Sequence, residues 1–327
     1  MNHPNQRILF LFPGQGSQYL GMGQDLYQTY DCVRQTYHEA SEILGYDMAA
    51  LSFDDPQEQI HLTRYTQPAL LTHSVACLRV FQELLARPIS AEASAGHSLG
   101  EYTALVAAGA LEFKTALSLV HHRGTLMGNY GAGEMEALPL GLKEAELLAE
   151  KHFSSIAACN LPDQTVVGGL SEDLDKLVDE LTQQFPKKRS ARLRTEGAFH
   201  TYYMVEAARR FRLILDKAPL ISPQIRVLSN YTGGFHDDDP DIIKSRLFWQ
   251  LTNPVRWHEN LISALDSGLN TFVEFGGGIG KGETPADKKP NLAAIIKKAT
   301  RKADAPPTYH AVINADTLLD TTSLFSK

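Results

Sequence analysis

Apolar residues near the start of the chain follow strand spacing and helix spacing in turn. The compact apolar run RILFLF (7–12) predicts a buried strand, and the Gly- and Pro-containing stretch PGQGSQ after it predicts a turn. A mostly helical stretch follows (21–44). Apolar positions recur at helical spacing over 66–86, after a Thr and a Pro, which predicts a helix with proline in its first turn. The small-residue stretch 89–98 then predicts a strand that leads into an Ala-rich helix ending near Gly109.

The pattern changes character after residue 130. Over about 65 residues the chain shows a strand, a Lys- and Glu-rich helix, two strands about an Asn-Leu-Pro-Asp turn, a second helix and a last strand. This order is that of a ferredoxin-like unit, which we expect as an inserted small subdomain at 131–195. The chain returns to the larger unit at GAFHTYYM (197–204), and IRVLSN (225–230) and NTFVEF (270–275) predict two more of its strands.

Composition narrows the class of protein. The 327 residues are 43% hydrophobic and 21% charged, values typical of a globular protein with a sizeable core. A net charge of -7 argues against nucleic acid as a partner, since phosphate contacts need a basic surface. No apolar run approaches the ~20 residues of a membrane span and the N-terminus lacks a signal-peptide pattern, so we expect no membrane partner and a cytoplasmic location. Three Cys without CxxC and twelve His without HExxH indicate neither a disulfide framework nor a metal site.

The stretch AGHSLGEYTALVAAG (95–109) carries the strongest chemical signal. Ser98 is in a G-x-S-x-G motif between a predicted strand and a predicted helix, which is the context of a nucleophile elbow. An ordinary Gly-bounded turn is the alternative interpretation of the pentapeptide alone. A nucleophilic Ser needs a base, and His200 is the best candidate because GAFHTYYM joins a strand end to a helix start. A lone His is more often structural, so the pair is a hypothesis at this level.

These elements predict the fold class α/β. We expect an α/β-hydrolase-like large subdomain made of 1–130 and 196–285, with the ferredoxin-like subdomain inserted at 131–195. Residues 286–327 form a C-terminal extension. The segments GGGIGKGETPADKKP and KADAPP interrupt the apolar pattern and predict that about the last 45 residues are loosely packed.

Seven sequence blocks occur in one order, which is far more specific than any single block. The blocks are FLFPGQGSQYLGMG, TQPALL, GHSLGEYTALVAAGAL, HHRGTLMG, CNLPDQTVVGG, GAFHTYYM and TNPVRWHENL. In order and spacing they resemble the malonyl-CoA:acyl-carrier-protein transacylases, and the resemblance covers about residues 7–281. GAFHTYYM is most similar to the discrete, trans-acting acyltransferases that serve polyketide synthases.

The resemblance implies a catalytic set of five residues. Ser98 would be the nucleophile and His200 its base. No acidic third member is implied, because a backbone carbonyl orients the imidazole and Gln250 in FWQLTNPVRW matches the position that supplies it. A main-chain acceptor fixes the tautomer as an Asp would, without the charge. Gln15 and Leu99 would supply the backbone N–H donors of the oxyanion hole.

The resemblance also implies a malonyl pocket. Arg123 matches the family Arg that pairs with the free carboxylate of a malonyl group, since a guanidinium can bind a carboxylate through two donors. Phe199 beside the base narrows the space for an α substituent, while Gln67 and Asn160 support the pocket or are purely structural. The implied reaction is ping-pong transfer from malonyl-CoA, through an acyl-Ser, to the phosphopantetheine thiol of a carrier protein, with no cofactor and no metal.

The implied partner is an acyl carrier protein or a carrier domain of a polyketide synthase, and we expect the enzyme to be a monomer. Carrier proteins are typically acidic, so an enzyme of net negative charge needs a local basic face for them. Lys187, Lys188 and Arg189 precede the His200 block and are the docking candidates. An ordinary solvated basic stretch is the alternative.

Two other functions are open from the sequence. The first is an acyl-carrier-protein thioester hydrolase on the same scaffold. Arg123 argues against it, because a desolvated Arg gains nothing from a neutral acyl chain. The second is an idle docking module, against which the intact Ser98 and His200 blocks argue. The family pattern also breaks at FGGGIGKGETPADKKP, where Ile replaces a Pro and a polar loop is inserted, and RTEGAFH is more polar before the His than the family pattern.

Overall fold

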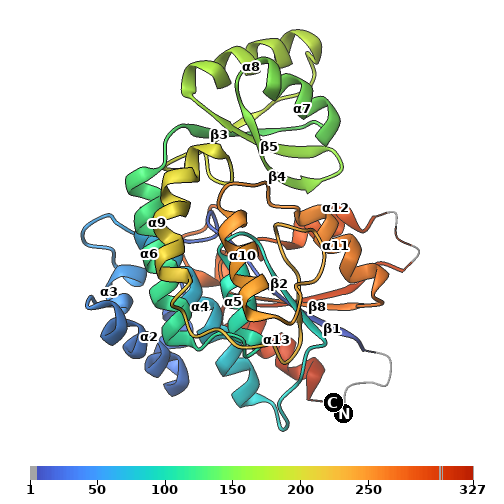
Figure 1. Cartoon of the computed structure of the whole chain (residues 1–327). Coiled ribbons are helices and arrows are strands. Elements are labelled where there is room, and N and C mark those ends of the chain that lie inside the picture. Colours follow the sequence, from blue (N-terminus) through green and yellow to red (C-terminus); the bar gives the residue numbers. More distant parts are fainter. Residues whose placement is uncertain (1–5, 302, 304, 327) are drawn as a thin grey trace.

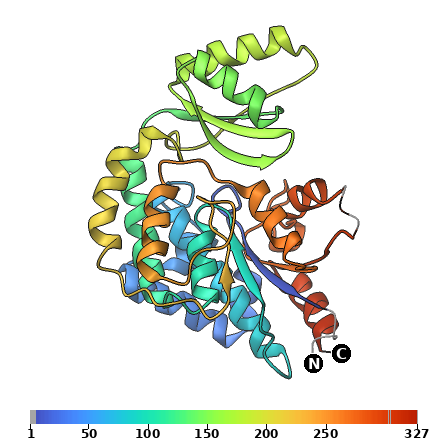
Figure 2. The ribbon, with the colours of Figure 1, turned by 45° about the vertical axis from the view of Figure 1, so that its right-hand side comes forward.

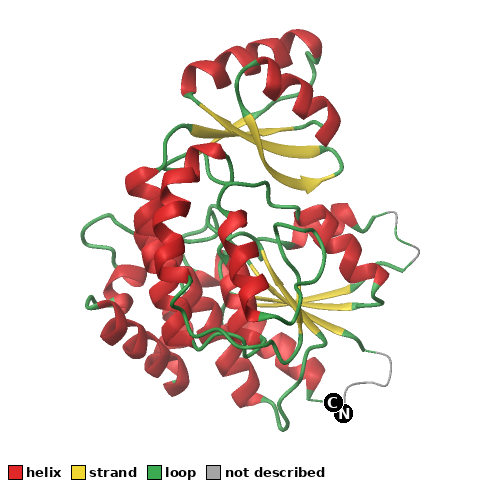
Figure 3. Cartoon of the chain, viewed as in Figure 1, coloured by secondary structure: helices red, strands yellow, loops and turns green. Residues whose placement is uncertain are grey.

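The computed structural model describes residues 6–301, 303 and 305–326 of the chain. Figures 1 and 2 show two units, a larger one built around a five-stranded sheet and a smaller one with a four-stranded sheet, which lies on one end of the larger unit in both views. In Figure 3 the strands of the small unit form one layer and its two helices form the other. The chain therefore has a mixed α/β fold, as predicted.

The five strands of the large unit are all parallel, and the apolar run RILFLF supplies the central one. Every residue of β1 (Ile8–Phe12) is buried, because strands flank it on both sides and helices cover the sheet. The predicted strands at 225–230 and 270–275 are both present, the first over only two residues. The order across the sheet is β7 (Arg226–Val227), β2 (Ala93–Gly96), β1, β8 (Thr271–Phe275) and β9 (Thr308–Val312).

β1 and β2 end side by side, which brings the loops after them to the same edge of the sheet. Phe12 pairs with Gly96, so the PGQGSQ turn and the Ser98 turn leave the sheet together. Glycine at 96 and 100 lets the backbone fold back on itself. A Cβ on Gly96 would lie 1.9 Å from the Gly100 carbonyl carbon, and a Cβ on Gly100 would lie 2.2 Å from the Phe12 carbonyl oxygen. The G-x-S-x-G spacing is therefore a steric requirement of this turn.

Helices surround the large sheet (Figures 1 and 3). The predicted helix at 66–86 exists, but it begins at Thr63, so Pro68 lies inside it rather than in its first turn. The proline removes one backbone donor there, and the extensive burial of this helix outweighs that loss. Before the small unit, the large unit has α1 (Gln24–Thr29), α2 (Asp31–Leu44), α3 (Met48–Phe53), α4 (Thr63–Leu84), α5 (Gly100–Ala107) and α6 (Phe113–Tyr130). After it come η1 (Tyr202–Met204), α9 (Val205–Leu215), α10 (Pro240–Gln250) and α11 (Trp257–Asp266).

The small unit has a hydrophobic core of its own under an antiparallel sheet of order β4-β5-β3-β6. Leu138, Leu148 and Leu174 belong to this core, which is separate from the main one. The elements all lie inside the predicted interval 131–195. They are β3 (Glu134–Leu138), α7 (Leu142–Lys151), β4 (Ser155–Leu161), β5 (Gln164–Gly169), α8 (Ser171–Gln184) and β6 (Ala191–Leu193).

The loose packing predicted for the C-terminal segment is wrong. β9 pairs with β8 and completes the large sheet, and Val312 and Leu318 are buried. The Gly-, Pro- and Lys-rich loops lie between these elements and do not replace them. The polar residues of β9, which are common in edge strands, interrupt the apolar pattern by which a strand is predicted. Residues 302 and 304 of KADAPP lie outside the described residues. The remaining elements are η2 (Pro285–Asp287), α12 (Ala293–Ala299) and α13 (Ala315–Phe325).

Candidate active site

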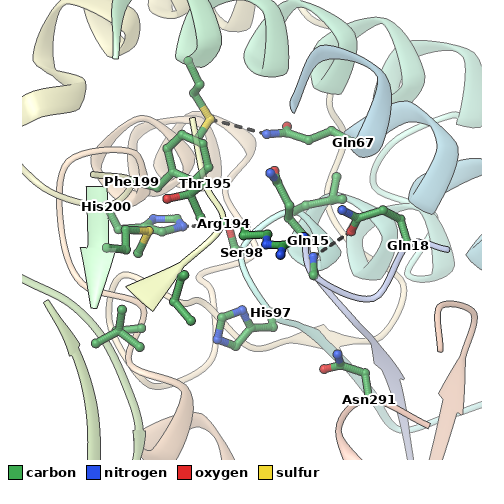
Figure 4. A pocket seen from close by; sticks show the side chains of 18 of the residues that line it. Gln15, Gln18, Gln67, His97, Ser98, Arg194, Thr195, Phe199, His200 and Asn291 are labelled. Carbon is green, nitrogen blue, oxygen red and sulfur yellow. Dashed lines mark hydrogen bonds between the residues drawn. The ribbon is translucent and has the colours of Figure 1, made fainter. Parts of the chain in front are cut away.

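A cavity of about 720 Å³ lies between the two units (Figure 4). The turns after β1 and β2 line one side of it, through residues that include Gln15 and Ser98. Strands of the small unit line the other side, for example through Met135 and Val166. Asn291, just before α12, and Ile295 in α12 add a further wall. The cavity is therefore open to the two sequence motifs predicted to carry the chemistry.

Ser98 and His200 meet in this cavity, as predicted. Ser98 Oγ lies 2.7 Å from His200 Nε2, and His200 Nδ1 lies 2.7 Å from the backbone carbonyl oxygen of Gln250. A carbonyl can only accept, so Nδ1 carries the proton of the neutral imidazole and Nε2 can accept from the Ser hydroxyl. Burial lowers the pKa of His200 to about 3, and the charge of Arg123 is the second cause. The imidazole is thus neutral near pH 7, which is the protonation state of a base.

Both members of this pair have left-handed backbones. Ser98 has φ 53° and His200 has φ 63°, although neither is glycine. Such conformations cost free energy and persist where surrounding contacts hold them, most often at functional sites. Asn230 holds the Ser98 turn: its Oδ1 accepts from Ser98 N at 2.6 Å and its Nδ2 donates to Gly96 O at 2.7 Å.

Arg123 from α6 is buried beside the pair. Its Nη2 donates to Ser98 Oγ at 3.3 Å and to the side-chain oxygen of Gln250 at 3.0 Å, and its Nη1 donates to Gln67 Oε1 at 2.9 Å. Its Nε is buried and has no partner among the described residues. Arg123 is therefore a buried side chain in contact with Ser98, not a solvated one on the surface of α6.

The remaining residues predicted for the pocket also line the cavity: Gln15, Leu99, Phe199 and Asn160. Neither the Gln15 nor the Leu99 amide donates to a backbone carbonyl within the described part of the chain. The Gln15 side chain donates to Thr63 Oγ1 at 3.2 Å. Asn160 Oδ1 accepts from His97 Nε2 at 2.9 Å, which fixes the amide at the cavity wall.

The three docking candidates are not brought to the cavity. Lys187, Lys188 and Arg189 lie in the loop between α8 and β6, and none of them lines the cavity. Arg189 donates to backbone carbonyls of its own loop. Arg194, an exposed residue directly after β6, does line the cavity. The docking role of the three residues stays a prediction.

Sequence reasoning missed a buried polar network behind the pair. Glu101 in the first turn of α5 accepts from Asn230 N at 3.0 Å, from Gln250 Nε2 at 2.7 Å and from His236 Nε2 at 2.7 Å. The available signal was a charged residue placed directly after GHSLG, in a helix of otherwise small and apolar residues. An unpaired carboxylate at such a position would be too costly to bury, so partners had to be expected.

A metal-binding cluster and a membrane-spanning helix are both absent from the described part of the chain. Across the residues that the structure describes, no three His, Cys, Asp or Glu side chains gather where they could hold a metal ion. None of the described helices combines the length and the apolar character needed to span a bilayer.

Comparison with known proteins agrees with this geometry. The family described as "Acyl transferase domain" matches residues 9–276. The chain belongs to this acyl transferase family. A malonyl CoA-acyl carrier protein transacylase of Bacillus subtilis is 37% identical over 90% of this chain and 91% of its own length. A polyketide biosynthesis malonyl CoA-acyl carrier protein transacylase of Bacillus velezensis is 36% identical over 83% of this chain and 93% of its own length.

A solved structure of a related protein has the same fold as this acyl transferase. It is a malonyl-transacylase in complex with a type II polyketide synthase acyl-carrier protein, with a TM-score of 0.87 and 32% identity, and the match covers 98% of this chain and 100% of that chain. The family match ends at residue 276, just after β8, whereas the match to this solved structure covers 98% of the chain. The wall that α12 adds to the cavity lies beyond the family match.

Proposed function

We propose that this acyl transferase moves a malonyl group from CoA to the phosphopantetheine thiol of an acyl carrier protein through an acyl-enzyme on Ser98. The observation that carries the proposal is a buried arginine, Arg123, whose guanidinium reaches the hydroxyl of a Ser already paired with a His. The names of the similar proteins support the same reaction and the same kind of acceptor.

In the first half-reaction Ser98 Oγ attacks the thioester carbonyl carbon of malonyl-CoA while its proton passes to His200 Nε2. The carbonyl oxygen becomes an oxyanion, for which the amides of Gln15 and Leu99 are the proposed donors. The C–S bond then breaks, and His200 returns the proton to the CoA sulfur. The products are CoA and a malonyl ester of Ser98.

In the second half-reaction the phosphopantetheine thiol takes the place of CoA. It gives its proton to His200, its sulfur attacks the ester carbonyl, and the C–O bond to Ser98 breaks as the proton returns to Oγ. One site can serve both thiols in turn because they enter after each other. The Gln250 carbonyl keeps the imidazole in the tautomer that both half-reactions need.

Arg123 supplies the preference for a carboxylate. Arg123 lines the cavity beside Ser98, and its Nη groups, which donate to neutral side-chain oxygens, can turn to the free carboxylate of a malonyl group, a stronger acceptor. The same desolvated charge disfavours neutral acyl groups, which argues against the hydrolase alternative. Phe199 beside His200 limits the space for a substituent on the acyl chain, and Gln67 orients the guanidinium.

Two finer assignments belong to the proposal. We assign an α/β-hydrolase-like large subdomain (1–130 and 196–285) and an inserted ferredoxin-like subdomain (131–195), supported by the nucleophile turn at the end of a parallel strand and by the order β4-β5-β3-β6. We also assign carriers of polyketide biosynthesis as the acceptors, supported by the names of two of the similar proteins.

Intact-protein mass measurement tests the proposal. The enzyme is mixed with malonyl-CoA, acetyl-CoA or a longer neutral acyl-CoA, and then with holo or apo carrier protein. We expect a malonyl adduct that is absent in Ser98→Ala, persists without an acceptor and is discharged by the holo carrier protein only. Rapid release of free acid from neutral acyl thioesters, with no transfer to the carrier, would establish the hydrolase instead.

A further inference from the structure

A single buried carboxylate connects the two segments that hold the nucleophile and its base. Glu101 is 0% exposed, and its Oε2 accepts from Asn230 N at 3.0 Å and from Gln250 Nε2 at 2.7 Å. Asn230 in turn accepts from Ser98 N, and the Gln250 carbonyl accepts from His200 Nδ1. One oxygen atom is therefore two hydrogen bonds away from both members of the pair.

Gln250 has its side-chain hydrogen bonds fully committed. Its Oε1 accepts from Arg123 Nη2, and the two N–H groups of its amide donate to Glu101 Oε2 and to the Ser98 carbonyl oxygen at 3.0 Å. Rotating this amide by half a turn would set its N–H groups against the Arg123 donor and its oxygen against the Glu101 carboxylate. Arg123 and Glu101 thus fix one orientation of the residue whose backbone orients the base.

We infer that Glu101 is a positioning residue, which aligns Ser98 through Asn230 and His200 through Gln250. The inference rests on the proposed role of Ser98 as nucleophile. Its physical basis is that the left-handed Ser98 turn and the His200 imidazole are both held by outside contacts, and the contacts on each side converge on the same carboxylate. Alignment of a nucleophile and base to within a fraction of an ångström is what such supporting residues provide.

The isosteric change Glu101→Gln separates position from charge. In that variant the amide oxygen can stand where Oε2 stands and keep both Asn230 N and Gln250 Nε2. The amide nitrogen then faces His236, whose Nε2 can become the acceptor because its Nδ1 has no partner among the described residues and can take the proton. All three contacts survive this exchange, whereas Glu101→Ala removes all three.

The experiment measures the rate at which Ser98 becomes acylated. Single-turnover loading from malonyl-CoA gives a saturating rate and a half-saturation concentration, and a small uncharged reagent, phenylmethylsulfonyl fluoride, reports the reactivity of Ser98 without using the acyl pocket. For Glu101→Ala we expect both rates to fall by roughly 30-fold, less than the 10² to 10⁴-fold worth of a positioned base because the base is misplaced but still present. The half-saturation concentration should change by less than about 3-fold. For Glu101→Gln we expect both rates within about 5-fold of wild type.

Matched variants keep the result interpretable. Glu136→Ala removes another buried glutamate, in β3 of the small unit, and should leave the loading rate within about 3-fold of wild type. Asn230→Ala removes only the side-chain contacts to the Ser98 turn and should slow labelling of Ser98. Thermal unfolding shows whether Glu101→Ala folds, and Asn230→Ala provides the test if it does not.

Three results would overturn the inference, and none of them resembles a failure of the proposed function. Glu101→Ala could fold and label Ser98 at the wild-type rate. Glu101→Gln could be as slow as Glu101→Ala, which would assign the effect to charge. Where Glu101→Ala does not fold, Asn230→Ala could label at the wild-type rate. A wild-type enzyme that forms no adduct at all on Ser98 would instead refute the proposed function itself.

Discussion

Replacing Arg123 with Ala is expected to abolish the preference of this enzyme for a carboxylate-bearing acyl group. The guanidinium is buried, its Nη2 lies 3.3 Å from Ser98 Oγ, and its Nε has no partner among the described residues. It is the positive charge proposed to receive the malonyl carboxylate, so its removal leaves that carboxylate without a partner in a desolvated cavity.

The expected fall in malonyl loading follows from the burial of Arg123. Truncating one partner of a buried, hydrogen-bonded charge pair costs about 2 to 5 kcal/mol. At about 1.4 kcal/mol for each factor of ten, malonyl loading should fall by roughly 30-fold to several thousand-fold. Acetyl loading should hold or rise, because a neutral acyl group no longer leaves a buried guanidinium unpaired.

The assay is a competition between malonyl-CoA and acetyl-CoA, read as the ratio of malonyl to acetyl adduct on Ser98. Arg210→Ala, in α9 and away from the cavity, is the control for loss of an arginine. Arg123→Ala also leaves the side-chain oxygens of Gln67 and Gln250 without this donor, so some loss of stability is expected and thermal unfolding should be recorded beside the ratio. An unchanged ratio in a folded variant would remove Arg123 from acyl recognition.

Four further predictions concern the base and the carrier. His200→Ala should slow both half-reactions by roughly 10² to 10⁴-fold, and single-turnover rates within a few-fold of wild type would mean that another base acts. Because burial lowers the pKa of His200 to about 3, the acid limb of the kcat/KM profile should lie well below pH 6.5; a limb near 6.5 that vanishes in His200→Ala would contradict this. Between pH 6.5 and 3 the unfolded chain holds a proton on His200 that the folded chain does not. His200 should therefore make the free energy of unfolding fall as pH drops through this range, and should add no pH dependence above 6.5. Urea unfolding of wild type and His200→Ala over that pH range tests this, because the free energy of unfolding should fall less steeply toward low pH in the variant. Reversing the charges of Lys187, Lys188 and Arg189 should weaken transfer to the carrier more than loading from CoA, and more so at low salt; equal effects on both steps, or no effect, would exclude these residues from docking.

The sequence was sufficient to predict those features that short segments encode. The central strand β1 is a continuous apolar run, and the Ser98 turn carries its glycines at fixed spacing, so both could be predicted without partners. The pairing of Ser98 with His200 is a contact across 102 residues. From the two segments it was only a hypothesis, because nothing in either segment specifies the other, and the family resemblance turned it into a definite prediction.

Other features depend on which elements the fold brings together. Asn230 and Glu101 are 129 residues apart and meet because a strand pair and a helix start converge at one sheet edge. β9 carries Thr and His in an edge strand next to Gly- and Pro-rich loops, so its pattern indicated a loose tail. The basic loop at 187–189 precedes the His200 block in sequence, yet β6 separates it from the cavity that Arg194 reaches.

The two left-handed residues have a consequence for laboratory evolution. Ser98 at φ 53° and His200 at φ 63° each adopt a conformation that glycine would accept at little cost, whereas a side-chain-bearing residue pays on the order of 1 to 3 kcal/mol. Replacement by glycine at either position would therefore relieve strain and delete a reacting group in the same step. A screen that rewards heat resistance alone will be drawn toward such inert proteins, so every round of selection on this enzyme has to score turnover together with melting temperature.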